Sequence, residues 1–176
     1  LKTRNHRQRI CKPNSKLFLM RINITELSKT EMLGRVIADY LTKFQGLAIF
    51  YLDGDLGTGK TTLVREVLKS LGWSGAVKSP TFSIIEEYKL NDIDIFHSDL
   101  YRLNGENDFE MLGLEINEQT KGILFIEWPE KISKFNFGNE FFLKLSIVNK
   151  QRFIEFKSTS QEFLNCINRI NIKDPI

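Results

Sequence analysis

The pattern of apolar and polar residues predicts a strand, a short loop and a helix in the middle of the chain. Residues 47–53 (LAIFYLD) form an apolar run that is typical of a buried strand. Apolar residues then recur at helical spacing until Gly72, where the helix should end; they are Leu63, Val64, Val67, Leu68 and Leu71. The glycine-rich segment between these elements is therefore a strand-to-helix loop.

One strand and one helix are expected before this unit. Residues 17–24 can form the strand, and Ser28 with Glu31 has the spacing of a capping box that opens a helix. The apolar stripe of this helix runs to about Phe44, and Gly46 should end it. The stripe consists of Met32, Leu33, Val36, Ile37, Tyr40, Leu41 and Phe44.

Two hairpins are expected after it. Residues 83–90 and 93–96 are strand-like runs on either side of Asn91-Asp92, which predicts a hairpin inserted after the strand-loop-helix unit. Residues 141–148 and 152–157 alternate well enough to form a second hairpin. Both would add antiparallel strands to a parallel sheet.

The remaining segments complete a small α/β fold. Residues 122–126 (GILFI) form a second fully apolar run that ends at Glu127 and predicts an interior strand. Residues 106–114 suit a short helix, and a closing helix is suggested by Phe163, Ile167 and Ile170. We expect one three-layer α/β domain whose mixed sheet has a parallel core and antiparallel hairpin additions.

Charge divides the chain into a basic start and an acidic body. The 176 residues include 25 Lys and Arg and 22 Asp and Glu, and their 41% hydrophobic content suits one globular domain. Six basic residues and no acid lie in residues 1–19; they are Lys2, Arg4, Arg7, Arg9, Lys12 and Lys16. Removing them leaves 19 basic and 22 acidic residues, a net charge of −3. Residues 20–176 thus lack a general nucleic-acid footprint, so any link to RNA should run through a partner protein.

Residues 1–19 are expected to be a dispensable tail, with a functional arm or a targeting segment as the alternative, because Met20 looks like a natural start of the domain. Cys11 and Cys166 are too few for a disulfide framework or a zinc cluster. No apolar run approaches the roughly 20 residues that cross a bilayer. The protein is expected to be cytoplasmic, with no membrane partner.

Residues 54–61 (GDLGTGKT) have the spacing of a phosphate-binding loop, G-x-x-x-x-G-K-T. Its glycines let successive backbone N–H groups turn toward an anion, and the following helix adds its positive N-terminal end. Lys60 can reach the β- and γ-phosphates, and the Thr61 hydroxyl suits Mg²⁺. The residues expected to bind nucleotide here are Asp55, Leu56, Gly57, Thr58, Gly59, Lys60, Thr61 and Thr62.

Glu127 is placed to be the acid that holds Mg²⁺, directly or through water, at the end of a neighbouring strand. Most such loops pair with Asp, so the longer Glu is a departure. The alternative is an exposed glutamate at a strand end.

Two polar clusters at strand ends lie between the loop and Glu127. In the first, residues 78–82 (KSPTF), Pro80 favours a projecting loop that brings the Thr81 hydroxyl near the γ-phosphate or Mg²⁺. The alternative is that Ser79-Pro80-Thr81 merely starts a strand.

The second cluster is residues 97–102 (HSDLYR). Asp99 could orient or deprotonate a water, and Arg102 could offset charge on a transferred phosphoryl group. Alternatively, the two simply pair on a turn. A lone histidine here is more often a packed strand-end residue than a base, so packing is the expectation for His97.

Trp128 could stack on a base, anchor a partner or lie in the core.

Residues 149–152 (NKQR) have Arg152 where a guanine-reading Asn-Lys-x-Asp motif has its carboxylate, which weighs against GTP. The segment otherwise reads as a polar hairpin turn.

Taken together, four ordered motifs resemble the TsaE (YjeE) family: GDLGTGKTT at 54–62, VKSPTF at 77–82, HSDLYR at 97–102 and EWPE at 127–130. The resemblance spans roughly residue 22 to the end. It implies a small Mg²⁺-dependent ATPase that works with the TsaD and TsaB proteins in making threonylcarbamoyladenosine on tRNA, so tRNA is reached only through the complex. TsaE would be a switch driven by ATP, weakly active alone and accelerated by its partners.

The resemblance also implies roles for individual residues. Thr61 and Glu127 look like the Mg²⁺ positions, Lys60 like the phosphate lysine and Asp99 like the essential carboxylate. The resemblance further implies that residues 79–81 are a switch-like loop, that Trp128 is a functional tryptophan and that the residue 150–152 turn lies near the nucleotide. We also expect Thr81 to be catalytic, Arg152 to bind nucleotide, and a switch or partner role for Ser79, Arg102 and Trp128.

Two rival functions stay open. A small-molecule kinase with a phosphate-binding loop would usually need an Arg-rich lid, and no Arg cluster follows Gly105. A non-catalytic nucleotide-dependent scaffold is the second rival, and it would not need Asp99 for phosphate release.

Overall fold

The computed structural model describes residues 18–90, 93–114, 116–117, 119–135 and 137–171. The expected basic tail at residues 1–19 lies almost entirely outside these ranges, as do Cys11 and the Asn91-Asp92 turn. None of the helices within these ranges is long and apolar enough to cross a membrane.

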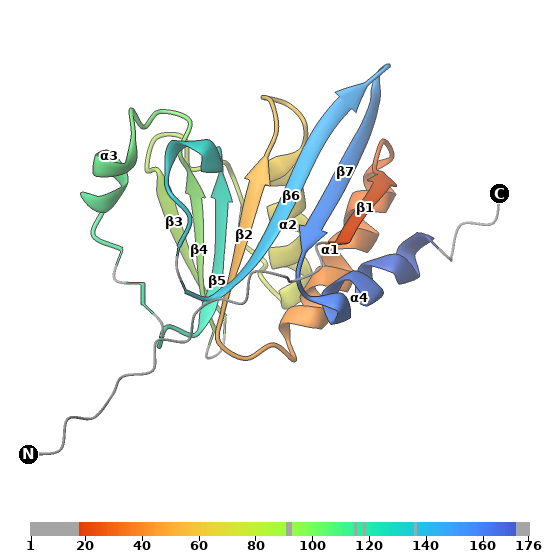
Figure 1. Cartoon of the computed structure of the whole chain (residues 1–176), viewed down its shortest axis with the longest axis horizontal. Helices are drawn as coiled ribbons and strands as arrows, with labels where there is room; N and C mark the ends of the chain where they lie inside the picture. The colour runs from red at the N-terminus through yellow and green to blue at the C-terminus, as the bar shows by residue number, and fades with distance from the viewer. Residues whose placement is uncertain (1–17, 91–92, 115, 118, 136, 172–176) are drawn as a thin grey trace, which may run out of the picture.

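Within the described ranges, seven strands form one mixed sheet in the order β1-β7-β6-β2-β5-β4-β3 (Figure 1). Their bounds are β1 Phe18–Asn23, β2 Leu47–Asp53, β3 Ile85–Leu90, β4 Ile93–Asp99, β5 Gly122–Glu127, β6 Asn139–Val148 and β7 Gln151–Ser158. β2 runs parallel to β5 and β6, β5 also runs parallel to β4, and the other pairs are antiparallel. The predicted parallel core with hairpin additions is confirmed, and one strand of each hairpin joins the core.

The two faces of the sheet bury separate apolar cores. Along β2, Ala48, Phe50 and Leu52 contribute to one core, while Leu47, Ile49 and Tyr51 contribute to the other. The first core is covered by α1 (Leu27–Leu41), α2 (Lys60–Leu71) and α4 (Gln161–Asn171). The second is covered by residues of and around α3 (Glu106–Glu110) and η1 (Pro129–Lys131). In Figure 1, α3 lies apart from α1, α2 and α4.

The start of α1 differs from the predicted capping box. The helix begins at Leu27 with Glu26 as its N-cap, so Ser28 lies inside the first turn and cannot cap it. The Asn23 side chain accepts a hydrogen bond from the Thr25 backbone N–H at 2.9 Å, which turns the chain directly after β1. This side-chain turn brings the chain into the helix earlier than expected.

Register brings the ends of the parallel strands to one edge of the sheet. Glu127 pairs with Leu52 of β2 on one side and with Asp99 of β4 on the other. The phosphate-binding loop follows β2 at the same edge. Ligands of open α/β sheets bind beyond such carboxyl ends, so this edge is where the candidate site should lie.

Candidate nucleotide-binding site

The loop between β2 and α2 has the backbone geometry of an anion cradle. Gly54, Gly57 and Gly59 have φ angles of +142°, +78° and +107°, a region that glycine occupies without strain. A Cβ on Gly54 would lie 2.3 Å from the Leu145 carbonyl oxygen of β6. Only glycine therefore fits there. In a glycine-rich loop of this kind, backbone N–H groups and the N-terminus of the following helix favour an anion.

Lys60, the first residue of α2, lies at the bottom of this loop and is only 4% exposed. Its Nζ donates to the backbone carbonyls of Gly54 at 2.6 Å and Asp55 at 3.1 Å. Burial lowers the pKa of Lys60, and the nearby carboxylates of Glu127, Asp99, Glu130 and Asp53 oppose this shift. The loop thus holds a partly desolvated cation.

Thr61 lies beside Glu127, as the metal-site hypothesis requires. The Thr61 hydroxyl donates to Glu127 Oε1 at 2.7 Å. Glu127 is 3% exposed, so the alternative of a solvated strand-end glutamate is wrong. The pair joins the first turn of α2 to the end of β5.

His97 is a functional candidate that the sequence interpretation undervalued. The ring is fully buried, as expected of a packed residue, but its Nε2 lies 2.9 Å from Glu127 Oε1. One signal was available: residues 97 and 99 of a strand lie on the same face, so His97 should share the face of Asp99.

Asp99 holds the second polar cluster together. Its Oδ2 accepts hydrogen bonds from the hydroxyls of Ser79 and, at 3.1 Å, Thr81, while its Oδ1 accepts one from the Tyr101 backbone N–H at 3.1 Å. Thr81 therefore contacts Asp99, and its proposed approach to the γ-phosphate stays a prediction.

The Ser79-Pro80-Thr81 segment does not start a strand. It forms a turn in which the Ile84 N–H donates to the Pro80 carbonyl at 2.6 Å, and β3 begins only at Ile85. The expected strand start at Ser83 is two residues too early because Ile84 has a φ of +66°, outside the extended region.

Arg102 does not pair with Asp99. Its guanidinium lies over the Phe82 ring, 4.1 Å from the centroid, and both side chains are exposed. The alternative of a simple Asp99–Arg102 pair is therefore wrong. Arg102 instead makes a second contact between the residue 79–82 turn and the segment after β4.

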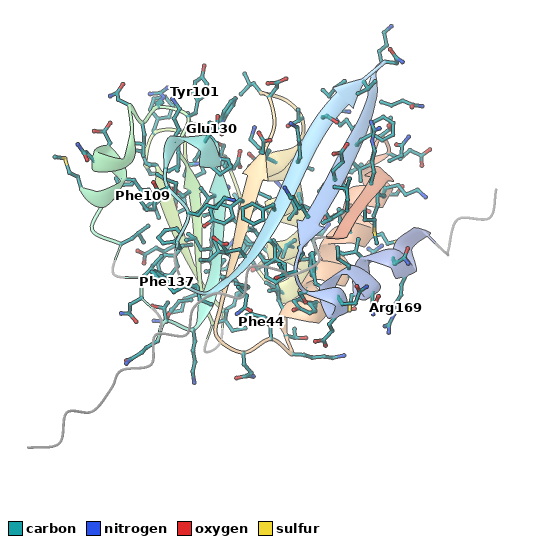
Figure 2. The ribbon with its side chains drawn as sticks, viewed as in Figure 1. Phe44, Tyr101, Phe109, Glu130, Phe137 and Arg169 are labelled. Atoms are coloured by element: carbon teal, nitrogen blue, oxygen red, sulfur yellow. The ribbon has the colours of Figure 1, made fainter. Side chains whose placement is uncertain are left out.

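Trp128 lies at the site and is half-buried. The Lys60 Nζ is 4.2 Å from the centroid of its ring, and the Tyr101 ring is 5.0 Å away. Figure 2 shows Tyr101 and Glu130 toward the top of the view, and Phe44 and Phe137 toward the bottom. Trp128 thus links the phosphate lysine to the segment that carries Asp99.

Arg152 lies on the β6–β7 hairpin, which projects beyond the neighbouring strands (Figure 1). Its side chain is exposed. Its backbone N–H donates to Thr25 Oγ1 at 2.9 Å, and its carbonyl accepts from the Ile24 N–H at 2.8 Å. These contacts join the hairpin to the β1–α1 connection, and a role in nucleotide binding stays a prediction.

The arrangement suits a metal ion that arrives with phosphates. Among the residues described, no group of three or more His, Cys, Asp and Glu side chains could hold an ion alone. Thr61 and Glu127 supply oxygen ligands, the type that Mg²⁺ prefers, and Mg²⁺ usually takes its other ligands from water and substrate phosphates. The residues present therefore fit Mg²⁺ bound to a nucleotide.

Comparisons with known proteins show what the chain is similar to. The protein called tRNA threonylcarbamoyladenosine biosynthesis protein TsaE from Haemophilus influenzae is 43% identical over 100 residues, which cover 56% of this chain and 63% of that protein. The proteins of the same name from Synechocystis and Bacillus subtilis are each 38% identical to this chain over the matched residues. The Synechocystis match covers 64% of this chain and 72% of that protein. The Bacillus match covers 49% of this chain and 53% of that protein. The chain thus matches less than two thirds of the Haemophilus protein's length.

The crystal structure of Bacillus subtilis YdiB shares the fold, with a TM-score of 0.60 over 90% of this chain and 98% of that one, at 20% identity. The model of the family described as threonylcarbamoyl adenosine biosynthesis protein TsaE matches residues 24–160. This range is well over half of the chain and includes the phosphate-binding loop, Asp99 and Glu127. The chain therefore belongs to the TsaE family.

Proposed function

We propose that this chain is an ATP-driven switch in the synthesis of threonylcarbamoyladenosine on tRNA, acting with TsaD and TsaB. The observation that carries the proposal is the hydrogen bond from Thr61 to Glu127, directly beside Lys60 and the phosphate-binding loop. A hydroxyl, a carboxylate and a lysine at the end of such a loop are the groups that MgATP requires. Membership of the TsaE family supports the tRNA modification as the process served.

The phosphate-binding loop would hold the β- and γ-phosphates of ATP. Its N–H groups and the α2 N-terminus favour anions. The Lys60 ammonium group donates hydrogen bonds to the loop carbonyls of Gly54 and Asp55. Phosphate oxygens are stronger, charged acceptors. Lys60 would therefore give up its hydrogen bonds to Gly54 and Asp55 and bond to the phosphates of the nucleotide.

Thr61 and Glu127 are the residues that would hold Mg²⁺. The ion, when bound, supplies positive charge that neutralises the phosphate oxygens during transfer. Protein groups hold Glu127 in place, because Thr61 and His97 both bond to it.

Asp99 would orient the attacking water or accept its proton. In this structure Oδ2 of Asp99 accepts hydrogen bonds from Ser79 and Thr81, while Oδ1 accepts one from the Tyr101 N–H. A shift of the residue 79–81 turn would free Oδ2 for a water. Hydrolysis would therefore be slower while the turn is closed on Asp99, which fits an enzyme that depends on its partners.

The same contacts carry the state of the nucleotide to the surface. Lys60 touches Trp128, Trp128 touches Tyr101, and the Tyr101 N–H bonds to Asp99, which holds the turn. Phe82 on this turn is 87% exposed. A change at the phosphates would thus move an exposed aromatic residue that a partner protein can contact.

The test is ATP hydrolysis, measured as phosphate release, with and without TsaB and TsaD for the native chain and Lys60→Ala. We expect weak activity alone, stimulation by the partners and loss of both in the variant. Absence of stimulation, or an unaffected variant, would overturn the switch proposal. Transfer of phosphate to an added small-molecule acceptor would instead support a kinase.

The engagement of Asp99 by the turn also suits a non-catalytic scaffold. In that case nucleotide would change assembly with TsaB and TsaD without phosphate release, and Asp99→Asn would leave the release rate at its background level. Measuring assembly and hydrolysis on the same samples separates the two.

A further inference from the structure

Packing alone does not explain why a histidine, whose ring nitrogens need hydrogen bonds, is fully buried at position 97. The ring is fully buried near the end of β4, and its Nδ1 has no hydrogen-bond partner within the described part of the chain. Leaving a buried polar atom unpaired disfavours the folded state. A phenylalanine would fill a similar volume without this cost, so the bond made by the other ring nitrogen should account for the histidine.

That bond goes to the proposed metal carboxylate. β4 and β5 are parallel neighbours in which His97 pairs with Phe125 and Asp99 with Glu127, so His97 and Glu127 are diagonal neighbours on one face. Nε2 lies 2.9 Å from Glu127 Oε1. Because an ionised carboxylate only accepts hydrogen bonds, Nε2 is the donor.

Two donors converge on a single oxygen of Glu127. The Thr61 hydroxyl reaches Oε1 from α2 and His97 reaches the same atom from β4. Neither of these bonds uses Oε2. The carboxylate is thus held against rotation, while its second oxygen remains available to another ligand.

We propose that His97 is a positioning residue that orients Glu127 toward the magnesium ion of a bound nucleotide. The inference rests on the proposed function, since it deepens the role of the same site. Such a restraint matters more for this glutamate than for the aspartate that is usual in such loops, because the longer side chain has one more rotatable bond. A hydrogen bond that orients a metal ligand typically changes metal affinity or activity by about 10- to 100-fold.

The test measures nucleotide binding without partner proteins, so it does not depend on activity. Calorimetry gives the Kd of ADP in excess EDTA and in Mg²⁺, and the ratio of the two is the magnesium effect. His97→Phe retains a ring but no donor, and we expect its magnesium effect to fall about tenfold while the Kd in EDTA stays native. His97→Gln retains an amide donor near the Nε2 position and should recover most of the effect.

Introducing the same change into a Glu127→Ala variant shows whether His97 acts through Glu127. In Glu127→Ala there is no carboxylate to orient, so adding His97→Phe should change the magnesium effect no further. Independent, additive losses would overturn the proposal. So would a native magnesium effect in His97→Phe, or an equal loss of affinity in EDTA and in Mg²⁺, because both outcomes mean that the residue serves packing only.

If His97→Phe does not fold, His97→Gln and His97→Asn decide the question. The Asn amide corresponds to the Nδ1 position and should not reach Glu127, so we expect Gln to keep the magnesium effect and Asn to lose it. Equal effects in the two variants would overturn the proposal. Failure of the proposed function looks different: the native chain itself would then show no binding of ADP or no magnesium effect.

Discussion

The hydroxyl of Thr61 and the carboxylate of Glu127 lie 2.7 Å apart, although 66 positions separate them in the chain. Both should contribute oxygen ligands when MgATP binds. We predict that Thr61→Ala and Glu127→Ala each weaken nucleotide binding in Mg²⁺ by at least about tenfold, equivalent to about 1.4 kcal/mol. Calorimetry in Mg²⁺ and in EDTA provides the measurement.

The matched control is Thr61→Ser, which retains the hydroxyl and should bind nearly as the native chain does. If Thr61→Ala lost equal affinity with and without Mg²⁺, the hydroxyl would serve the loop's structure and not an ion.

Asp99 should matter for hydrolysis far more than for binding. Asp99→Asn keeps the shape but weakens the group as an acceptor of a proton from water, so partner-stimulated phosphate release should fall by roughly 100-fold. The Kd for ATP should change by less than about threefold, because the hydrogen bonds of Asp99 go to Ser79, Thr81 and Tyr101, and its carboxylate acts on Lys60 only through charge. A parallel loss of affinity would contradict the separation of roles.

The role of the Ser79 and Thr81 hydroxyls can be tested against that of the neighbouring Ser83 hydroxyl. Ser79→Ala and Thr81→Ala remove bonds to Asp99, whereas Ser83→Ala removes only a bond to the exposed Glu86. We predict that the first two change the stimulation of ATPase rate by TsaB and TsaD at least threefold, since they alter the attachment of the turn, and that Ser83→Ala does not. Equal effects of all three would mean that the turn does not couple to Asp99.

Lys60 should be needed for binding without being needed for folding. Burial lowers its pKa, which means that the folded chain disfavours the charged form. Lys60→Met keeps the length and removes the buried charge, so Tm should stay within about 4 °C of native, or about 1 kcal/mol. Affinity for ATP should nevertheless fall by at least tenfold, measured by calorimetry on the same sample. A large drop in Tm would show that its bonds to Gly54 and Asp55 stabilise the loop.

Tyr51 should make folding stability sensitive to alkaline pH. Its hydroxyl donates to Glu140 at 2.8 Å and accepts from the Phe135 N–H at 3.1 Å, and burial raises its pKa well above the usual value of 10. Above pH 10 the unfolded chain releases this proton while the folded chain keeps it. The stabilisation is therefore complete below pH 10 and is lost as the pH rises toward the folded-state pKa.

Urea unfolding of the native chain and Tyr51→Phe at pH 7 to 11 measures this effect. The variant should lose about 1–2 kcal/mol at pH 7, from the broken hydrogen bonds. It should also show a shallower decline in stability above pH 10. Some decline remains because burial also raises the pKa of Tyr40 and Tyr88. An unchanged alkaline slope would show that Tyr51 does not contribute.

The local elements of the site were predictable because their causes are local. Glycines at fixed offsets determine the phosphate-binding loop, an apolar run determines β2, and helical periodicity ending at Gly72 determines α2. The position of Glu127 beside the loop followed from one further rule, that a parallel neighbour ends at the same edge. The start of α1 was missed because the Asn23 side chain turned the chain earlier than the capping signal indicated.

The amino-acid sequence by itself determined which functional groups this protein carries: a glycine-rich loop, a lysine, a hydroxyl and acids at strand ends. Only the tertiary structure decided which groups meet, joining His97 and Thr61 to one oxygen of Glu127, Ser79 and Thr81 to Asp99, and Arg102 to Phe82. The reason is physical. Backbone propensity acts within a few residues, whereas these contacts depend on strand register and side-chain packing between distant segments.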